Sequence, residues 1–401
     1  MTQSFTKLAI LGSTGSIGRQ CLDVVESLPG RFGVVALAAG SNLEELVAQI
    51  EKYRPEVVSV RDAGKADELA QRLRAKGISP LPAIHHGPEG MLAVGTHGAA
   101  EMVVSAAVGV VGLAATYEAI KLGKTVALSN KEVLVAAGEL VMAAVKKSGR
   151  ELLPVDSEHN AVHQCLRGGQ RGEVRRLVLT ASGGPFRKTP LAAFESVTPE
   201  QALAHPNWRM GNRITIDSAT MMNKGFEIIE ARWLFGVQPN QIDVVIHPQS
   251  TIHSMVEFVD GSVLAQLGPT DMRMPLQYAL TYPERVASNQ VVALDWSRLR
   301  RLDFAKASTR RFPCLRLAKE ALKKGGALPC ALNAADEIAV AAFLERKLPF
   351  LGIPEVIERV LARTPKTRFE KMDDVLTADR EARRMAKEEV DRLAVTAAAA
   401  S

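Results

Sequence analysis

Hydrophobic positions along the first 156 residues form short runs separated by amphipathic segments. The six runs are residues 8–12, 34–40, 57–60, 102–108, 125–129 and 151–156. Several of them are apolar on both faces, as strands covered by helices on both sides must be. After the fifth run, Val133, Ala136 and Leu140 fall on one helical stripe. Gly149 supplies the stop signal of that helix. Strands that alternate with helices in this way predict an α/β fold with a Rossmann-like, doubly wound parallel sheet.

The pattern changes twice after residue 156. Residues 157–290 mix strand-like runs with Gly- and Pro-rich loops, which is typical of an α+β domain. Residues 291–312 show no strong periodicity, and we interpret them as a linker. Residues 313–401 contain four helical stripes, the last of them over 377–394 and opened by Thr377, so we expect a C-terminal helical bundle.

Composition narrows the class of protein. The 401 residues include 50 basic and 44 acidic ones, and no basic run is interleaved with aromatic residues, so we expect no nucleic-acid partner. The net charge of +6 suits anionic small molecules. No apolar run is long enough to span a bilayer, and the first strand begins too early for a signal peptide. Because the four cysteines form no CxxC pair, we expect free thiols and a cytoplasmic protein.

A glycine-rich turn, Gly12–Gly18 (GSTGSIG), follows the first predicted strand and opens the first helix. A dinucleotide pyrophosphate binds at this place in doubly wound folds, on backbone N–H groups at a helix N-terminus. The spacing is GxxGxxG rather than GxGxxG, and a plain capped turn is the alternative. The second run ends in Gly40, followed by Ser41 and Asn42, without the acidic residue of an NAD-specific site. This favours NADPH.

Two carboxylates lie at the end of the sixth run. Asp156 and Glu158 are two residues apart at a strand end, and in an extended chain they would point the same way. Paired carboxylates favour Mg²⁺ or Mn²⁺, whereas the alternative is a helix N-terminus with Glu158 in its first turn. His159 and His163 have the spacing of a zinc pair, but Asn160 stands where HExxH has its glutamate. We therefore interpret them as ordinary helix histidines.

Two further strand ends carry residues suited to anions. Lys131, in SNKE (129–132), either faces an anionic site or belongs to a capped helix N-terminus. The glycines of ASGGPF (181–186) would let an anion approach backbone N–H groups, and a plain turn is the alternative.

The densest polar segment is DSATMMNKGFEIIEA (217–231), which carries residue types that bind phosphate. Glu227 within it offers a third carboxylate for a metal, and a helix with Glu227 and Glu230 on its solvated face is the alternative. The preceding loop, HPNWRMGNR (205–213), has an apolar tip between Pro206 and Gly211. We interpret it as a substrate-covering lid, with Trp208 as a core plug in the alternative interpretation.

Together these motifs resemble those of the 1-deoxy-D-xylulose 5-phosphate reductoisomerase family. The motifs GSTGSIG, SNKE, VDSEHNA, SGGPF, HPNW, DSATMMNKG, HPQS and NAADE follow that family's order from residue 12 to about residue 337. Two positions depart from the family's pattern, since Ser41 stands where a basic residue is common and Asp336 replaces the usual Asn. The resemblance implies a homodimer whose chain contains an NADPH-binding domain, a catalytic and dimerisation domain, a linker and a C-terminal α-helical domain, over residues 1–156, 157–290, 291–312 and 313–401.

The resemblance also implies an activity: conversion of 1-deoxy-D-xylulose 5-phosphate to 2-C-methyl-D-erythritol 4-phosphate, in the non-mevalonate route to isoprenoids. The reaction would use NADPH as the hydride donor and Mg²⁺, Mn²⁺ or Co²⁺ as a Lewis acid on the substrate oxygens. The alternatives are a plain NADP-dependent dehydrogenase of another phosphorylated substrate and a non-enzymatic NADP-binding regulator. Both leave the three carboxylates unexplained.

By the same resemblance, residues of this sequence receive roles. The implied metal ligands, which also act in catalysis, are Asp156, Glu158 and Glu227, and of these Glu158 and Glu227 also contact the substrate. Further catalytic residues would be Lys131 and His205, which also contact the substrate. The other implied substrate ligands are Ser157, Ser182, Ser218, Asn223, Lys224 and, on the lid, Trp208. The implied cofactor contacts are Thr14, Gly15, Ser16, Ile17, Gly40, Asn42, Asn130, Glu132 and Gly211.

Overall fold

The computed structural model describes residues 5–208, 210–290, 292–297 and 299–400. The chain divides into two compact units. The first unit contains Met1–Val133, Val141–Asn160 and Asp271–Val292, and the second contains Leu134–Leu140, Ala161–Thr270 and Ala293–Ser401.

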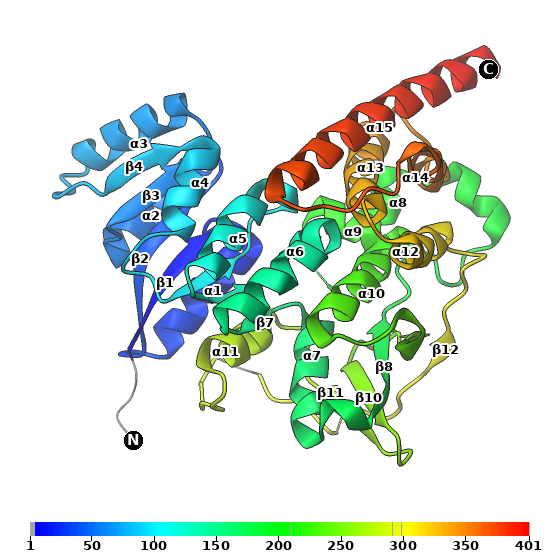
Figure 1. Cartoon of the computed structure of the whole chain (residues 1–401), viewed down its shortest axis with the longest axis horizontal. Coiled ribbons are helices and arrows are strands. Elements are labelled where there is room, and N and C mark those ends of the chain that lie inside the picture. Colours follow the sequence, from blue (N-terminus) through cyan, green and yellow to red (C-terminus); the bar gives the residue numbers. More distant parts are fainter. Residues whose placement is uncertain (1–4, 209, 291, 298, 401) are drawn as a thin grey trace. The chain divides into compact units, whose positions relative to one another are not determined.

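A seven-stranded parallel sheet forms the centre of the first unit (Figure 1). Its strands are β1 (Thr6–Leu11), β2 (Phe32–Ala38), β3 (Val57–Val60), β4 (Ala83–His86), β5 (Met102–Ser105), β6 (Thr125–Leu128) and β7 (Leu152–Pro154). Their order is β4-β3-β2-β1-β5-β6-β7, which confirms the predicted doubly wound sheet. Six strands match predicted runs. β4 has no predicted counterpart because it is an edge strand whose Ala83, His85 and His86 are exposed, so it carries no buried apolar run.

Helices cover this sheet. They are α1 (Ser16–Ser27), α2 (Leu43–Tyr53), α3 (Ala63–Ala75), α4 (Gly87–Gly95), α5 (Leu113–Lys121) and α11 (Arg273–Thr281). The helices α6 (Glu132–Ser148) and α7 (Ser157–Cys165) each contain residues of both units. One hydrophobic core joins β1, β2 and β3 to α1, α2, α3 and α11, and α4 lies against the same three strands. Leu276, Ala279 and Leu280 pack in this core, which is why α11 belongs to the first unit. The predicted domain boundaries at residues 156, 290 and 312 stay a prediction.

The second unit contains a mixed five-stranded sheet of order β11-β10-β8-β9-β12. The strands are β8 (Val174–Ala181), β9 (Ile242–Ile246), β10 (Ile252–Phe258), β11 (Val263–Leu267) and β12 (Ala305–Lys306). β8 pairs with β9 in parallel, and the other pairs are antiparallel. This confirms the α+β pattern expected here. β12 lies inside the segment interpreted as a linker, where it adds an edge strand beside β9.

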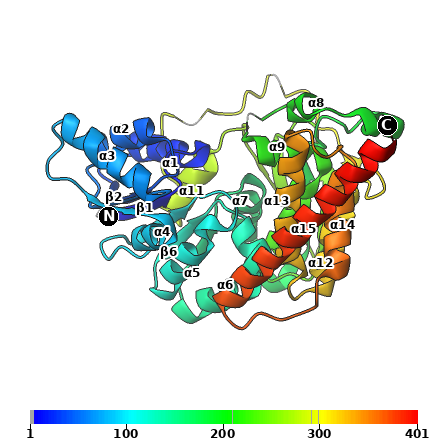
Figure 2. The same cartoon turned by 90° about the horizontal axis from the view of Figure 1, so that it is seen from above.

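The helices of the second unit are α8 (Pro199–Leu203), α9 (Asn212–Thr220), α10 (Met222–Phe235), α12 (Pro313–Lys324), α13 (Leu328–Leu344), α14 (Gly352–Arg363) and α15 (Met372–Ala400). The last four pack side by side, which confirms the predicted helical bundle (Figure 2). The predicted start of the last helix at Thr377 is wrong. α15 begins earlier because Asp374 accepts hydrogen bonds from the backbone N–H groups of Glu370 (2.9 Å) and Lys371 (3.1 Å).

The cysteines and the helices bear on two further expectations. All four cysteines are buried and none forms a disulfide. Among the residues that the structure describes, every helix is too short or too polar to cross a membrane.

Candidate active site

The turn between β1 and α1 is built around two glycines. Gly12 has a φ of +88°, and a Cβ added to it would lie 2.6 Å from the carbonyl oxygen of Ala106. A Cβ on Gly18 would collide with the backbone of Gly12. Gly15 is exposed and forms the N-cap of α1, and no side chain in the described part of the chain caps this helix. An exposed helix N-terminus of this kind suits a phosphate group.

The predicted ligands of the first unit follow four strands of one parallel sheet. Thr14–Ile17 follow β1, Gly40–Asn42 follow β2, Asn130–Glu132 follow β6, and Asp156–Glu158 follow β7. The carboxyl ends of parallel strands meet at one edge of a sheet, where ligands bind in doubly wound folds. The structure therefore brings these residues to the same edge.

Two of these residues also hold the backbone. The Asn42 side chain caps α2 by accepting a hydrogen bond from the Glu45 backbone N–H at 3.2 Å. Asn130 is buried, and its Nδ2 donates to the carbonyl oxygens of Ala107 and Gly109, the latter at 2.6 Å. Asn130 Oδ1 is buried without a hydrogen-bond partner among the described residues. A ligand contact from Asn130 would therefore use this oxygen.

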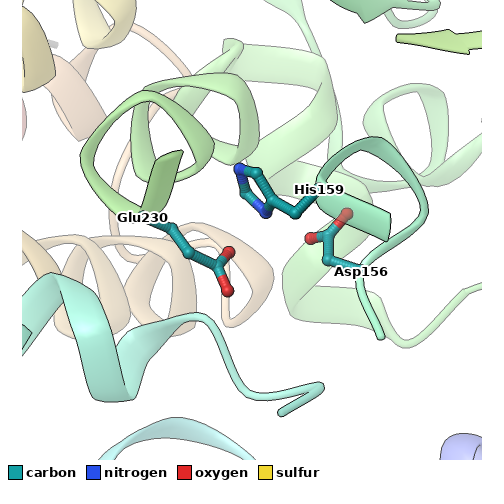
Figure 3. A group of neighbouring side chains, drawn as sticks. All are labelled: Asp156, His159 and Glu230. Atoms are coloured by element: carbon teal, nitrogen blue, oxygen red, sulfur yellow. The ribbon is translucent and has the colours of Figure 1, made fainter. Parts of the chain in front are cut away.

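A buried ion pair joins Lys131 to Asp156, whose side chains are each 8% exposed. Burial by itself raises the pKa of Asp156, but Lys131 and His159 outweigh burial and hold this pKa well below its usual value. Asp156 is therefore ionised, with Lys131 as its balancing cation. Figure 3 shows the side chains of Asp156, which directly precedes α7, of His159 on α7, and of Glu230 on α10.

Glu158 lies in the first turn of α7, so the prediction of an extended chain over residues 156–158 is wrong. Its backbone N–H donates to Asp156 Oδ1 at 3.4 Å, and Ser157 Oγ donates to Glu158 Oε2 at 2.6 Å. The segment is thus a helix N-terminus with Glu158 in the first turn, as in the alternative interpretation. Both carboxylates still lie at this end of the helix. Burial lowers the pKa of His163 to about 4, which fits the interpretation of a neutral helix histidine.

In the second unit, Ser182 follows β8 and contacts His205, with 3.0 Å between Ser182 Oγ and His205 Nε2. The backbone N–H of Gly184 donates to Ser182 Oγ at 3.2 Å. Gly184 has a φ of +63°, and a Cβ added there would lie 2.7 Å from the carbonyl oxygen of Ser218. Only a glycine fits this approach, so the turn after β8 lies directly against the helix that carries Ser218. The structure brings together three predicted substrate ligands here.

His205 also organises the loop that carries Trp208. Its Nδ1 accepts hydrogen bonds from the backbone N–H groups of Asn207 (3.2 Å) and Trp208 (3.0 Å). Burial lowers the pKa of His205, which favours the neutral ring that can accept these bonds. Asn207 Nδ2 donates to the Pro248 carbonyl oxygen at 2.6 Å, so the base of the loop is anchored. The Trp208 ring lies 6.3 Å from the ring of His253.

α9 and α10 meet at Met221, which has a φ of +64°. Beyond this corner, Lys224 and Glu227 form an ion pair in which the side chains are 3% and 0% exposed. Asn223 Nδ2 donates to Glu227 Oε1 at 2.6 Å. The alternative interpretation that Glu227 lies on a solvated face is wrong, because α10 is buried on all sides from Lys224 to Ala231.

Motif reasoning did not single out Arg213, which connects α9 to α13. Its guanidinium lies 3.7 Å from Asp217, 3.7 Å from Asp336 and 2.8 Å from Glu337. The i,i+4 spacing of Arg213 and Asp217 is visible in the sequence, but nothing there joins them to α13. Burial, and then the nearby Asp217, raise the pKa of Asp336 well above its usual value.

Comparison with known proteins gives the same family over most of the chain. Residues 8–138 match the family model described as 1-deoxy-D-xylulose 5-phosphate reductoisomerase. Residues 152–235 match the model of that enzyme's C-terminal domain, and residues 267–385 match the model described as DXP reductoisomerase C-terminal domain.

Individual relatives cover nearly the full length. The 1-deoxy-D-xylulose 5-phosphate reductoisomerase of Solibacter usitatus is 53% identical over 383 residues, which are 95% of this chain and 96% of the relative. The solved structure of the Zymomonas mobilis enzyme in complex with NADPH is 43% identical, with a TM-score of 0.89 over 96% of this chain and 99% of that one. A structure of DOX-P reductoisomerase with NADPH, fosmidomycin and magnesium is 39% identical, with a TM-score of 0.92 over 97% and 99% of the two chains. This chain therefore belongs to the 1-deoxy-D-xylulose 5-phosphate reductoisomerase family.

Proposed function

We propose that this chain converts 1-deoxy-D-xylulose 5-phosphate into 2-C-methyl-D-erythritol 4-phosphate with NADPH and a divalent metal, in the non-mevalonate route to isoprenoids. The observation that carries the proposal is a pair of buried lysine–carboxylate contacts, Lys131–Asp156 and Lys224–Glu227, in a chain of this family. Hydride transfer alone needs no buried carboxylates of this kind. Solved relatives bound to NADPH and to magnesium support both cofactors. Four buried thiols suit a reducing compartment, which supports the cytoplasm.

We propose Asp156, Glu158 and Glu227 as the metal ligands, because each offers a carboxylate oxygen. An all-oxygen donor set suits Mg²⁺ or Mn²⁺, with Co²⁺ as a further candidate. The donor chemistry therefore fits the metal. Lys131 and Lys224 balance the negative charges of Asp156 and Glu227, and a bound metal cation would balance these charges in their place.

The remaining polar residues would bind and orient the substrate. Ser182, Ser218, Asn223 and Lys224 are the proposed phosphate ligands; the contacts of Ser182 with His205 and of Gly184 with the Ser218 backbone support a common site. Ser157, Lys131 and His205 would hold the sugar, and Trp208 would cover it and exclude water. When bound, NADPH supplies the hydride and the metal polarises substrate oxygens.

The proposed NADPH contacts lie at the strand ends of the first sheet and beside α9. Thr14, Gly15, Ser16 and Ile17 would hold the pyrophosphate at the α1 N-terminus, which carries no side-chain cap among the described residues. The other proposed contacts are Gly40, Asn42, Asn130, Glu132 and Gly211.

We also propose that two copies of the chain form a homodimer. β11 is an edge strand of the second sheet, and its Val263 and Leu264 are 50% and 40% exposed. Val259, in the turn before β11, is 67% exposed. An apolar edge strand of this kind favours a protein partner over solvent. Sedimentation of the purified protein at several concentrations tests the assignment, and a monomer at all of them would contradict it.

NADPH oxidation tests the activity directly. The purified chain is treated with a chelator, and the loss of NADPH absorbance is followed with 1-deoxy-D-xylulose 5-phosphate before and after Mg²⁺ or Mn²⁺ is added back. We expect oxidation only with metal and substrate together. Oxidation that ignores the chelator would indicate a plain dehydrogenase, and NADPH binding without any turnover would indicate a regulator.

A further inference from the structure

The tip of β2 lacks the charged side chain that usually binds the ribose of the cofactor. In doubly wound folds an acidic residue near this tip binds the ribose hydroxyls of NAD, whereas a nearby arginine accommodates the 2′-phosphate of NADP. Here the tip is Gly40-Ser41-Asn42, in which Gly40 and Ser41 are exposed and no residue is charged. The tip therefore permits a 2′-phosphate but does not itself supply a cation.

β3 supplies one. The pairing of β2 with β3 continues beyond the strands, because the Ala39 backbone N–H donates to the Ser59 carbonyl oxygen at 2.9 Å. One step further, the backbone N–H of Arg61 donates to the carbonyl oxygen of Gly40 at 3.1 Å. Arg61 is thus fixed in register beside the tip of β2, and its side chain is 64% exposed.

Arg61 keeps donors for a ligand despite its neighbour Asp62. Arg61 Nε donates to Asp62 Oδ2 at 3.0 Å, which involves one of the five N–H groups of the guanidinium. Asp62 Oδ1 caps α3 by accepting the Lys65 backbone N–H at 3.0 Å, so the negative charge of Asp62 also stabilises the positive end of that helix. The Nη edge of Arg61 has the fork geometry that binds phosphate oxygens in pairs.

We propose that Arg61 binds the 2′-phosphate of NADPH and is the residue that makes this chain prefer NADPH to NADH. Ser41 and Asn42, after β2, then need only leave room for the phosphate. The positive charge comes from Arg61, after β3. The inference rests on the proposed use of NADPH.

Binding of the two cofactors to the intact chain without substrate tests the assignment. NADPH and NADH are titrated by cofactor fluorescence against the wild type, Arg61→Gln, Arg61→Lys and the control Arg72→Ala, which removes an exposed charge from α3. Arg61→Gln should weaken NADPH binding by about tenfold to a hundredfold, the value of a charged hydrogen bond, and leave NADH binding unchanged. Arg61→Lys should retain part of the preference, and Arg72→Ala all of it.

Three results would overturn the assignment of Arg61. They are an unchanged NADPH affinity in Arg61→Gln, an equal loss for both cofactors, or the same loss in Arg72→Ala. A wild-type chain that binds NADH as tightly as NADPH would instead overturn the proposed cofactor, and that result is visible before any variant is compared.

Discussion

Replacing Lys224 by alanine removes the cation from a fully buried pair, and its effect on stability should depend on the metal. Lys224 and Glu227 lie on one helix, one turn apart, and their side chains are 3% and 0% exposed. In Lys224→Ala the Glu227 carboxylate stays buried. It keeps the 2.6 Å hydrogen bond from Asn223 and loses the ion pair with Lys224.

The magnitude follows from this burial. Removing one partner of a buried ion pair typically costs about 3–5 kcal/mol, because the other charge remains in a medium that solvates it poorly. For a folding unit of this size, each kcal/mol lowers the Tm by roughly 2–4 °C, so the expected fall is about 6–20 °C. If Glu227 is a metal ligand, a bound divalent cation replaces the lost charge. Excess Mg²⁺ should therefore recover more Tm in Lys224→Ala than in the wild type.

Thermal unfolding with chelator and with Mg²⁺ measures both effects. Lys319→Ala serves as the control, since Lys319 is an exposed lysine of α12 and its loss should change stability by no more than about 0.5 kcal/mol. A double variant, Lys224→Met with Glu227→Gln, removes both charges and should be more stable than Lys224→Ala. A metal-induced rise in Tm that is equal in the wild type and in Lys224→Ala would refute the link between Glu227 and the metal. A double variant less stable than Lys224→Ala would refute the account of an uncompensated charge.

Three further predictions concern other parts of the site. Asp156→Asn keeps the shape of the side chain but removes a proposed metal ligand, so turnover should collapse at limiting Mg²⁺ while the Kd for NADPH stays within about twofold; wild-type turnover under those conditions would contradict it. The intrinsic fluorescence should change when fosmidomycin binds, and Trp208→Ser should abolish this change although Trp233 and Trp296 remain; an unaltered signal would make Trp208 an ordinary packing residue. Burial and Asp217 raise the pKa of Asp336 above its unfolded value, so this acid stabilises the fold fully at low pH and the contribution is lost as the pH rises through the folded pKa. The Tm of Asp336→Asn relative to the wild type should therefore rise with pH, and a difference that does not change with pH would show that Asp336 does not titrate.

The fold could be predicted from the sequence wherever an element is buried, because burial requires a recognisable pattern of apolar residues. The strands of the first sheet that lie between covering helices are apolar runs, and the C-terminal helices carry clear apolar stripes. β4 and β12 were not predicted, because both are short edge strands with mostly exposed side chains. Exposed positions do not need apolar residues, so no hydrophobic run marks these strands in the sequence. α15 began earlier than predicted because its capping group is Asp374, which lies inside the helix in sequence.

The candidate site was predictable as a set of positions but not as a set of contacts. Lys131 and Asp156 were located at strand ends of a predicted parallel sheet. They can form an ion pair because they follow β6 and β7, which are neighbouring strands in that sheet. The contact between Arg213 and Asp336 links residues far apart in sequence, and it depends on how α13 packs against α9. Hydrophobic periodicity places a helix on a core, but it does not say which of its polar residues faces which neighbour.

Three buried carboxylates of this chain are compensated in two different ways, and the difference bears on which of them can bind a metal. Asp156 and Glu227 are each paired with a lysine, so a cation that displaced the ammonium group would find a carboxylate that already lies beside a positive charge. Neither carboxylate oxygen of Asp336 has a hydrogen-bond partner among the described residues, and burial, followed by the nearby Asp217, raises its pKa. The raised pKa disfavours the anion that a metal needs, and a metal at Asp336 would also have to overcome repulsion from Arg213. The lysine pairs at Asp156 and Glu227 therefore support the proposal that these two carboxylates bind a cation, whereas the raised pKa of Asp336 argues against a metal at that residue.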